Sequence, residues 1–202
     1  MIDERAACLP VPFFRRDAIQ VARGLLGALL VSRCGGRRTV GRIVEVEAYL
    51  GAVDPASHAY QYRHHAQNEA LYGAAGSWYV YLSYGMHWCA NLVAGRPGEG
   101  AAILLRALEP MAGLPAMRRR RGVTHERLLC AGPGRLTQAL GISRTLDRRP
   151  MRTSLVHVVR DGRIRPGEIV VGPRIGITRA ADWPLRFTLR NSPWLSRAAG
   201  KT

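Results

Sequence analysis

A segment in the first quarter of the 202-residue chain alternates apolar and acidic side chains, and this pattern restricts the fold strongly. Thr39–Leu50 is rich in β-branched residues, which predicts a β-strand. Because side chains alternate along a strand, this strand has two unlike faces. The apolar face is expected to hold Val44, Val46 and Ala48. The opposite face is expected to hold Glu45, Glu47 and Tyr49.

Two carboxylates about 7 Å apart on one strand face allow two interpretations. One is a solvent-facing sheet edge. The other is a general base or an electrostatic stabiliser held on a rigid element. His58 follows in the loop after this strand, and a lone histidine is most often structural. The pattern leaves both interpretations open.

The remaining segments predict one α+β domain over 1–202, with 1–11 and 198–202 as loose termini. Asp17 is expected to cap a helix whose apolar face holds Ala18, Ala22, Leu25 and Leu29. Further helical pieces are expected at 68–72 and 135–140. Strands are expected at 77–84, 86–93, 101–108, 155–159, 168–171 and 185–189. Meander-like connections predict a mostly antiparallel sheet, curved and flanked by helices.

The charge is strongly basic and unevenly distributed. The chain has 30 basic and 14 acidic residues, a formal net charge of +16. Residues 1–101 hold 10 basic and 8 acidic residues, whereas 102–202 hold 20 and 6. All basic residues except Lys201 are arginines, whose planar fork suits phosphate, so nucleic acid is the simplest partner. The arginine run at 118–121 is either a solvated helix face or a phosphate-contacting stripe.

Composition and spacing exclude several classes of protein. No apolar run approaches the roughly 20 residues that span a bilayer, and the first residues do not form a secretory signal. The four cysteines contain no CxxC pair, and His87 with Cys89 lacks the second pair of a zinc site. We therefore expect a cytoplasmic, nucleoid-associated protein with no membrane contact, no metal and no cofactor.

Aromatic residues also alternate in the strand expected at 77–84. Tyr79, Tyr81 and Ser83 share one face, and Trp78 and Val80 lie on the other. Tyrosines on a sheet are most often half-buried packing residues, but in a basic protein they also stack on nucleobases.

Ordered blocks along nearly the whole chain, from about residue 12 to 197, resemble the 3-methyladenine (alkyladenine) DNA glycosylase family. The blocks are Glu-Val-Glu-Ala-Tyr-Leu-Gly at 45–51, Asp54, His58, the stretch 76–86, Asn91, and the stretches 104–110, 132–136, 174–176 and 192–196. The resemblance implies a monofunctional enzyme of base excision repair, which removes alkylated or deaminated purines by hydrolysing the N-glycosidic bond. Its partner would be double-stranded DNA containing damaged purines, bound by a monomer.

The resemblance also implies roles for individual residues. Glu47 would be the general base that activates water, with Arg106 near the water and the lesion phosphate. The pocket for the flipped base would be lined by Tyr49, His58, Tyr81 and Asn91, with Asn91 excluding normal guanine. DNA contacts would come from the wedge residue Tyr84 and from Met86, Arg63 and Arg135.

The residue chemistry agrees with these implied roles. A stacked base is unreachable until it is flipped, and a tyrosine at a turn tip, such as Tyr84 before Gly85, suits a wedge. Aromatic faces attract the cationic purines that alkylation produces, by about 0.5 to 2 kcal/mol. The only lysine is Lys201, so Schiff-base strand cleavage is not expected.

The loop at 59–68 departs from the family pattern. It keeps Arg63 and Asn68, but lacks the glycine, threonine, proline and second arginine that usually follow the histidine. Sequence alone therefore leaves the placement of His58 open. One hypothesis is that His64 and His65 partly substitute as contacts to the DNA backbone, more strongly at low pH.

Two other functions are open at this stage. The first is a non-catalytic nucleic-acid binding module on the same scaffold, which the altered loop favours. The second is a helix-hairpin-helix glycosylase with Asp147 as catalytic acid, for which the glycine pattern at 132–140 is poor. Sequence also leaves open the preferred lesion and any general acid for neutral lesions.

Overall fold

A long central strand, β2 (Thr39–Leu50), organises the sheet of this protein, whose computed structural model describes residues 8–162 and 164–197. Within these residues the sheet has eight strands. The other strands are β1 (Leu29–Ser32), β3 (Trp78–Ser83), β4 (His87–Ala94), β5 (Ala101–Ala112), β6 (Val156–Val159), β7 (Ile169–Gly172) and β8 (Arg186–Leu189). The α-helices are α1 (Val11–Phe14), α2 (Ala18–Leu25), α3 (Leu114–Arg121) and α4 (Pro133–Leu140).

Short 3-10 helices connect many of these elements. They are η1 (Cys34–Gly36), η2 (Gly51–Val53), η3 (Tyr60–Tyr62), η4 (Glu69–Tyr72), η5 (Glu126–Leu128), η6 (Arg144–Leu146), η7 (Met151–Thr153) and η8 (Pro166–Glu168). The predicted α+β class and antiparallel sheet are confirmed, with strand ends within a few residues of those expected.

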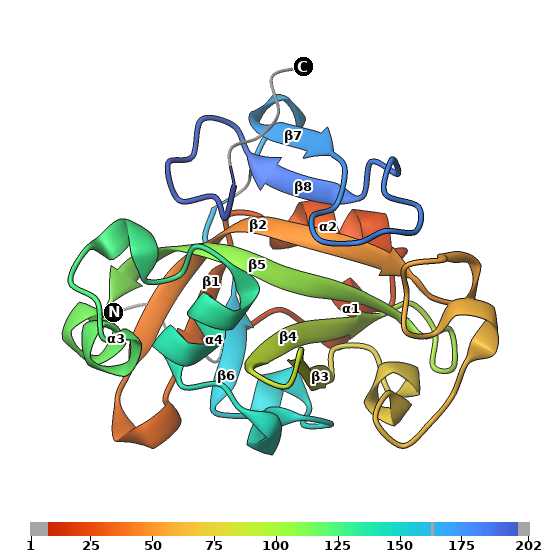
Figure 1. The fold of residues 1–202 in the computed structure, drawn as a ribbon, viewed down its shortest axis with the longest axis horizontal. Helices are drawn as coiled ribbons and strands as arrows, with labels where there is room; N and C mark the ends of the chain where they lie inside the picture. Colours follow the sequence, from red (N-terminus) through yellow and green to blue (C-terminus); the bar gives the residue numbers. More distant parts are fainter. Residues whose placement is uncertain (1–7, 163, 198–202) are drawn as a thin grey trace.

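The sheet forks at β2, as Figure 1 shows. One edge of β2 pairs with β5 along almost its whole length. On the other edge, β1 pairs with the first part of β2, and β8 pairs with 45–47 further along. All pairs are antiparallel, and the path β3-β4-β5-β2-β1-β6 forms the main sheet. The 45–47 stretch of β2 therefore lies between two strands rather than at a solvent-facing edge.

A β-bulge changes the expected faces of β2. The register with β5 shifts between Ile43 and Glu45 and again before Val46. Ile43 and Val46 thus both face the main core, whereas Val44 packs in a separate small cluster with Ala107. The prediction that Val44 shares a face with Val46 is wrong, because a bulge places two residues opposite one and breaks strict alternation.

The helix capped by Asp17 forms as predicted but ends earlier. The Asp17 carboxylate accepts hydrogen bonds from the backbone N–H groups of Ile19 and Gln20. The helix stops at Leu25, and Leu29 begins β1, a strand that the sequence analysis did not predict. The left-handed φ of +80° at Gly27 makes this early turn possible.

The N-terminal boundary of the domain also differs from the expectation. Cys8 is buried and bridges to Val159, and the Leu9 N–H donates to the Val158 carbonyl. Cys8 and Leu9 are therefore packed against β6 rather than loose. Residues 1–7 and 198–202 lie outside the described residues.

The arginine run on α3 is bound largely to the protein itself. Arg120 donates to the carbonyls of Cys34 and Ala139, at 2.6 and 3.0 Å, and Arg118 forms an ion pair with Glu126. Arg121 donates to the Gln138 side chain. These bonds join α3 to the C-terminal end of α4, so the run is more than a solvated helix face, and a phosphate contact by it stays a prediction.

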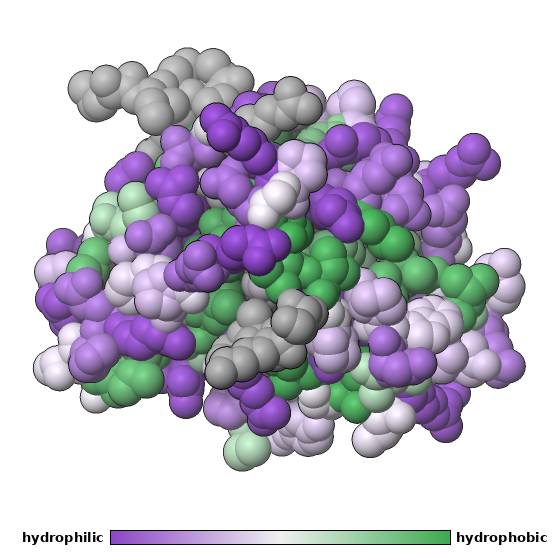
Figure 2. Space-filling view, turned by 90° about the horizontal axis from the view of Figure 1, so that it is seen from above, coloured by the Kyte–Doolittle hydropathy of each residue, from purple (hydrophilic) through white to green (hydrophobic). Residues whose placement is uncertain are grey.

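The surface seen from above is mostly hydrophilic, with hydrophobic residues gathered toward its middle and right (Figure 2). In the described part of the chain, no helix combines the length and the apolar character needed to cross a membrane.

Candidate active site

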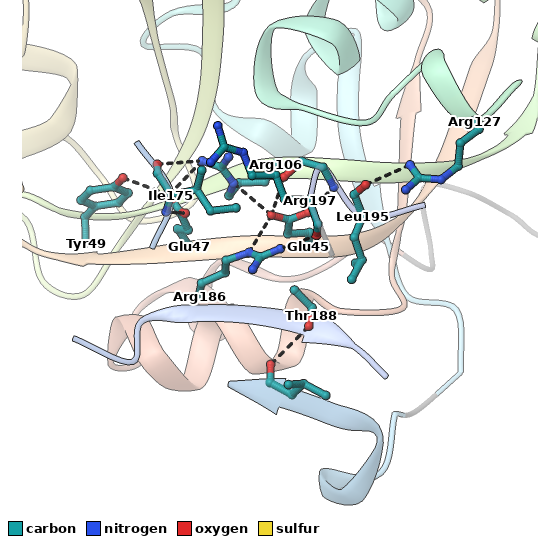
Figure 3. A network of polar contacts seen from close by, with 12 residues as sticks. Glu45, Glu47, Tyr49, Arg106, Arg127, Ile175, Arg186, Thr188, Leu195 and Arg197 are labelled. Carbon is teal, nitrogen blue, oxygen red and sulfur yellow. Dashed lines mark hydrogen bonds and ion pairs between the residues drawn. The ribbon is translucent and has the colours of Figure 1, made fainter. Parts of the chain in front are cut away.

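The Glu47 carboxylate lies at the centre of a buried polar network on the face of β2 opposite the main core (Figure 3). Glu47 Oε1 accepts a hydrogen bond from the Ile175 N–H at 2.7 Å. Its Oε2 accepts from the Tyr49 hydroxyl at 3.0 Å and from Arg106 Nη1 at 3.2 Å. The predicted alternation of β2 is thus confirmed for Glu47 and Tyr49, and three groups converge on one carboxylate.

Burial governs the electrostatics of Glu47. Its side chain is fully excluded from solvent, and desolvation raises the pKa of the carboxyl group. Arg106, the Ile175 N–H and the Tyr49 hydroxyl act in the opposite direction, because each stabilises the carboxylate form. The same desolvation, with the neighbouring Glu47 charge, raises the pKa of Tyr49, which keeps its hydroxyl protonated as a donor.

Glu45 lies beside Glu47 on β2 and has different partners. Its Oε1 accepts from Arg106 Nε at 3.1 Å and from Arg186 Nε at 2.8 Å. Ser196 completes the set: its N–H donates to Oε2 at 2.6 Å and its hydroxyl to Oε1 at 2.7 Å. Glu45 therefore connects β2, β5, β8 and the segment that follows β8.

A second buried ion pair, between Arg174 and Asp54, packs against the ring of Tyr49. The Arg174 guanidinium donates to both oxygens of Asp54, at 2.5 and 2.8 Å, and to the Ala48 carbonyl. Its Cζ lies 4.6 Å from the centre of the Tyr49 ring. Asp54 also accepts from the Leu50 N–H and so closes the turn after β2. One face of the Tyr49 ring is thereby covered by a cation.

Three rings from two segments form an aromatic wall: His58, Tyr79 and Tyr81. The rings of Tyr79 and Tyr81 stack with centres 5.3 Å apart, and the His58 ring meets Tyr81 edge-on at 4.6 Å. His58 Nδ1 lies 2.7 Å from the Tyr79 hydroxyl. His58 is open to solvent, yet desolvation by the surrounding protein lowers its pKa, and the nearby His65 and Arg63 lower it further. A lowered pKa keeps this imidazole neutral at neutral pH.

The aromatic wall belongs to a cavity of about 900 Å³. The predicted residues that line it are Tyr49, His58, Arg63, Tyr81, Tyr84, Asn91 and Arg106. Asn91 is buried in this wall, and its side-chain amide donates to the Tyr79 carbonyl at 3.0 Å. Glu47 itself lies directly behind the lining, since each of its three partners, Tyr49, Arg106 and Ile175, is a lining residue.

Asn68 organises the atypical loop at 59–68. Its buried side chain accepts from the His65 N–H and donates to the carbonyls of His58 and Arg63. Gln61 and Tyr62 adopt left-handed φ angles of 53° and 58°, which non-glycine residues rarely do. The side-chain hydrogen bonds of Asn68 thus hold the backbone at His58 and Arg63 in this loop.

The two histidines of this loop lie at different places. The exposed His64 ring packs against Tyr72, with centres 4.5 Å apart, and His65 lines the cavity. The hypothesis that they contact the DNA backbone stays a prediction.

The tip of the β3–β4 hairpin exposes two large apolar side chains, of which Tyr84 lines the cavity and Met86 is not among the lining residues. Tyr84 is 84% exposed and Met86 is 70% exposed. Tyr84 and Gly85 both have positive φ, at 50° and 68°, and the Met86 N–H donates to the Ser83 carbonyl. This turn holds a large apolar ring in solvent although the left-handed conformation costs a tyrosine about 1–2 kcal/mol.

Not every predicted site residue reaches the cavity. Arg135 is exposed on α4 and donates to the Ala131 carbonyl, and it is not among the lining residues, whereas its neighbour Pro133 is. Asp147 lines the cavity, but its carboxylate accepts a hydrogen bond from the Val80 N–H at 2.8 Å. It thereby satisfies a backbone donor on the outer edge of β3. Between β5 and β6, only α3, α4 and short 3-10 helices occur, and no helix-hairpin-helix surrounds Asp147 among the described residues.

Sequence reasoning assigned no role to three residues that complete the site: Asp54, Arg174 and Ile175. Tyr79, which the strand alternation placed on one face with Tyr81, lines the cavity beside it. Asp54 and Arg174 belong to matched blocks, but only the folded chain shows that they pair. Ile175 acts through its backbone N–H, for which side-chain identity carries no signal.

A larger cleft of about 1640 Å³ lies over β1 and β6 and contains none of the predicted site residues. Among the described residues, no group of three or more His, Cys, Asp or Glu side chains could hold a metal ion. The convergence of titratable groups, rather than cavity size, therefore identifies the candidate active site.

Comparison with known proteins identifies the family of this chain. The family model described as "Methylpurine-DNA glycosylase (MPG)" matches residues 12–193. A protein of Methanoculleus marisnigri named "Putative 3-methyladenine DNA glycosylase" is 47% identical over 94% of this chain and 98% of its own length. Proteins with the same name from Nitrobacter winogradskyi and Burkholderia orbicola are 48% and 45% identical, over 92% and 95% of this chain and 85% and 92% of their own lengths. The chain therefore belongs to the methylpurine-DNA glycosylase family.

Proposed function

We propose that this protein is a monofunctional DNA glycosylase that flips an alkylated or deaminated purine into the 900 Å³ cavity and hydrolyses its N-glycosidic bond. The observation that carries the proposal is the fully buried Glu47 carboxylate, bonded to three groups that line an aromatic cavity. Its substrate would be double-stranded DNA, and the protein would act as a monomer.

Glu47 is suited to the role of general base. Burial raises the pKa of its carboxyl group, and a carboxylate with a raised pKa accepts a proton from water more readily. In the proposed step, the water oxygen forms a bond to the sugar C1′ while the bond between C1′ and the purine nitrogen breaks. The bonding electron pair leaves with the purine, and the water proton passes to Glu47.

The lining suits a cationic purine. The rings of Tyr49, His58 and Tyr81 offer faces and edges to a flat base, and aromatic faces attract a cation. The lowered pKa of His58 keeps that ring neutral, so that it does not repel a positively charged lesion. Asn91 would then select among purines from the floor of the cavity.

A cationic purine needs no further acid, because departure with the electron pair neutralises it. Lesions that are neutral would require protonation, and none of the lining residues is assigned to this step. Schiff-base strand cleavage is not proposed, because the single lysine, Lys201, is near the chain end and outside the described residues.

Tyr84 is the proposed wedge. Flipping a base costs a few kcal/mol of stacking and pairing, and a ring inserted at the vacated position offsets part of this cost. The 84% exposure of Tyr84, held out by a left-handed turn, supports this role. Arg63, which lines the cavity, and the exposed Met86, two residues after Tyr84, would contact the surrounding DNA.

The decisive experiment replaces the general base. Glu47→Gln is expected to bind a duplex containing 7-methylguanine as the parent does, but to release the base at least about a hundredfold more slowly. Single-turnover base release and equilibrium binding measure the two properties separately. Glu126→Gln, which alters an exposed carboxylate on η5, is the matched control and should keep the parent rate. Undiminished release by Glu47→Gln would refute the assignment.

The same experiment separates this proposal from a non-catalytic binding module. A parent protein that binds damaged duplexes but releases no base from 3-methyladenine, 7-methylguanine, hypoxanthine or ethenoadenine would favour the binding module. Base release from any of them identifies the preferred lesion class.

A further inference from the structure

Glu45 and Glu47 compete for the same guanidinium, because both carboxylates form ion pairs with Arg106 (Figure 3). Arg106 Nε donates to Glu45 Oε1 at 3.1 Å, and Nη1 donates to Glu47 Oε2 at 3.2 Å. An arginine facing one carboxylate alone prefers two parallel hydrogen bonds to it. Because Glu45 holds Nε, Glu47 receives a single bond from Arg106.

Arg186 is restrained in the same way. It lies opposite Glu47 in the register between β2 and β8, yet its Nε donates to Glu45 Oε1 at 2.8 Å. Its Nη2 donates to the Arg197 carbonyl. Glu45 therefore draws two guanidinium groups toward itself and away from its neighbour.

Several hydrogen bonds fix the Glu45 carboxylate in the position from which it binds Arg106 and Arg186. It is fully buried, and Ser196 donates to both of its oxygens through the backbone N–H and the hydroxyl. Arg127 fixes the same C-terminal segment through the Leu195 carbonyl at 2.9 Å without contacting either carboxylate. The position of Glu45 is thus set by four bonds from three parts of the chain.

We infer that Glu45 is a positioning residue for base release, which holds Arg106 and Arg186 so that Glu47 keeps a free lone pair for the attacking water. This inference rests on the proposed function of Glu47. Without Glu45, Arg106 can turn its fork fully onto Glu47 and form a bidentate ion pair. A carboxylate neutralised in that way is a weaker base.

The pH dependence follows from the groups around Glu47. The titratable and charged groups that act on it are Glu45 and Tyr49 on β2, Arg106 on β5, Arg186 on β8, Cys89 on β4 and, behind Tyr49, Arg174. The Glu45 charge raises the pKa of Glu47, and Arg106 lowers it. Loss of the Glu45 charge therefore lowers the pKa of Glu47 both directly and through a closer Arg106.

The test is the pH profile of single-turnover base release from a 7-methylguanine duplex. For Glu45→Gln we expect the plateau rate to fall on the order of tenfold to a hundredfold. The midpoint of the acidic limb should move to lower pH by roughly half to one unit. Arg127→Gln loosens the C-terminal segment without touching the carboxylates, and should keep the midpoint of the parent. A folded Glu45→Gln protein with an unchanged midpoint would overturn the inference.

A second variant decides the question if Glu45→Gln fails to fold, which circular dichroism would reveal. Arg186→Gln removes one cation near Glu47 and frees Glu45 for Arg106, so the midpoint should rise. An unchanged or lower midpoint would contradict the inference. Failure of the proposed function is distinguishable, since in that case Glu47→Gln would itself retain base release.

Discussion

Two arginine-rich regions of this molecule hold their guanidinium groups in different ways. Beside β2, three buried arginines face three buried carboxylates. These are Arg106, Arg174 and Arg186 with Glu45, Glu47 and Asp54. On α3, the run at 118–121 binds mainly backbone carbonyls and a glutamine side chain, together with one exposed glutamate.

The difference shows that the density of arginines in a sequence does not reveal how their guanidinium groups are bound in the folded protein. The α3 run is the densest positive stretch of the chain, yet it fastens one helix to another. The scattered arginines beside β2 build the candidate site, because burial makes each charge depend on a specific partner. Removing a partner should therefore be costly beside β2 and mild on α3.

The largest effect is expected where a buried charge loses its partner. Asp54→Asn leaves the fully buried Arg174 guanidinium uncompensated and should lower the free energy of unfolding by about 3–5 kcal/mol. Urea denaturation at neutral pH measures this loss. Combining it with Arg174→Gln should recover part of the stability, since no unpaired charge then remains. A loss below about 1 kcal/mol would show that the pair is not a structural unit.

A smaller effect is expected on α3. Arg120→Ala removes hydrogen bonds to two carbonyls and should lower the free energy of unfolding by about 1–3 kcal/mol, with unchanged affinity for DNA. The neighbouring Arg119 is exposed, and Arg119→Ala is the matched control, expected to change stability by less than about 0.5 kcal/mol. Weaker DNA binding by Arg120→Ala at unchanged stability would support the phosphate-stripe interpretation.

The smallest effect concerns a histidine of the aromatic wall. The pKa of His58 is lowered, so the ring is neutral at pH 7.5 and gains charge only below its ordinary pKa of about 6.5. A charged ring repels a cationic base. In a Glu47→Gln background, the preference for a 7-methylguanine duplex over an undamaged one should fall severalfold between pH 7.5 and 5, and His58→Gln should abolish this fall. A pH-independent preference would remove His58 from cation selection.

Local patterns in the sequence predicted most elements of the fold. The Asp17 cap, the strand Thr39–Leu50 and the turn at Tyr84 and Gly85 each depend on neighbours a few residues apart. The alternation of β2 also brought Glu45, Glu47 and Tyr49 to one face, as predicted. The alternation did not predict the bulge at Val44, because a bulge depends on the pairing with β5 rather than on the residues of β2.

Sequence by itself determined which residue types stand at which positions of the strands, and so identified the carboxylates and the aromatic rings of the site. Only the tertiary structure decided which arginine faces which carboxylate, that the Ile175 N–H binds Glu47, and that Asn68 holds the loop of His58. The physical reason is range. Periodicity and capping act within a few residues, whereas the arginine and carboxylate partners lie up to 141 positions apart in the chain and meet only when the sheet is assembled.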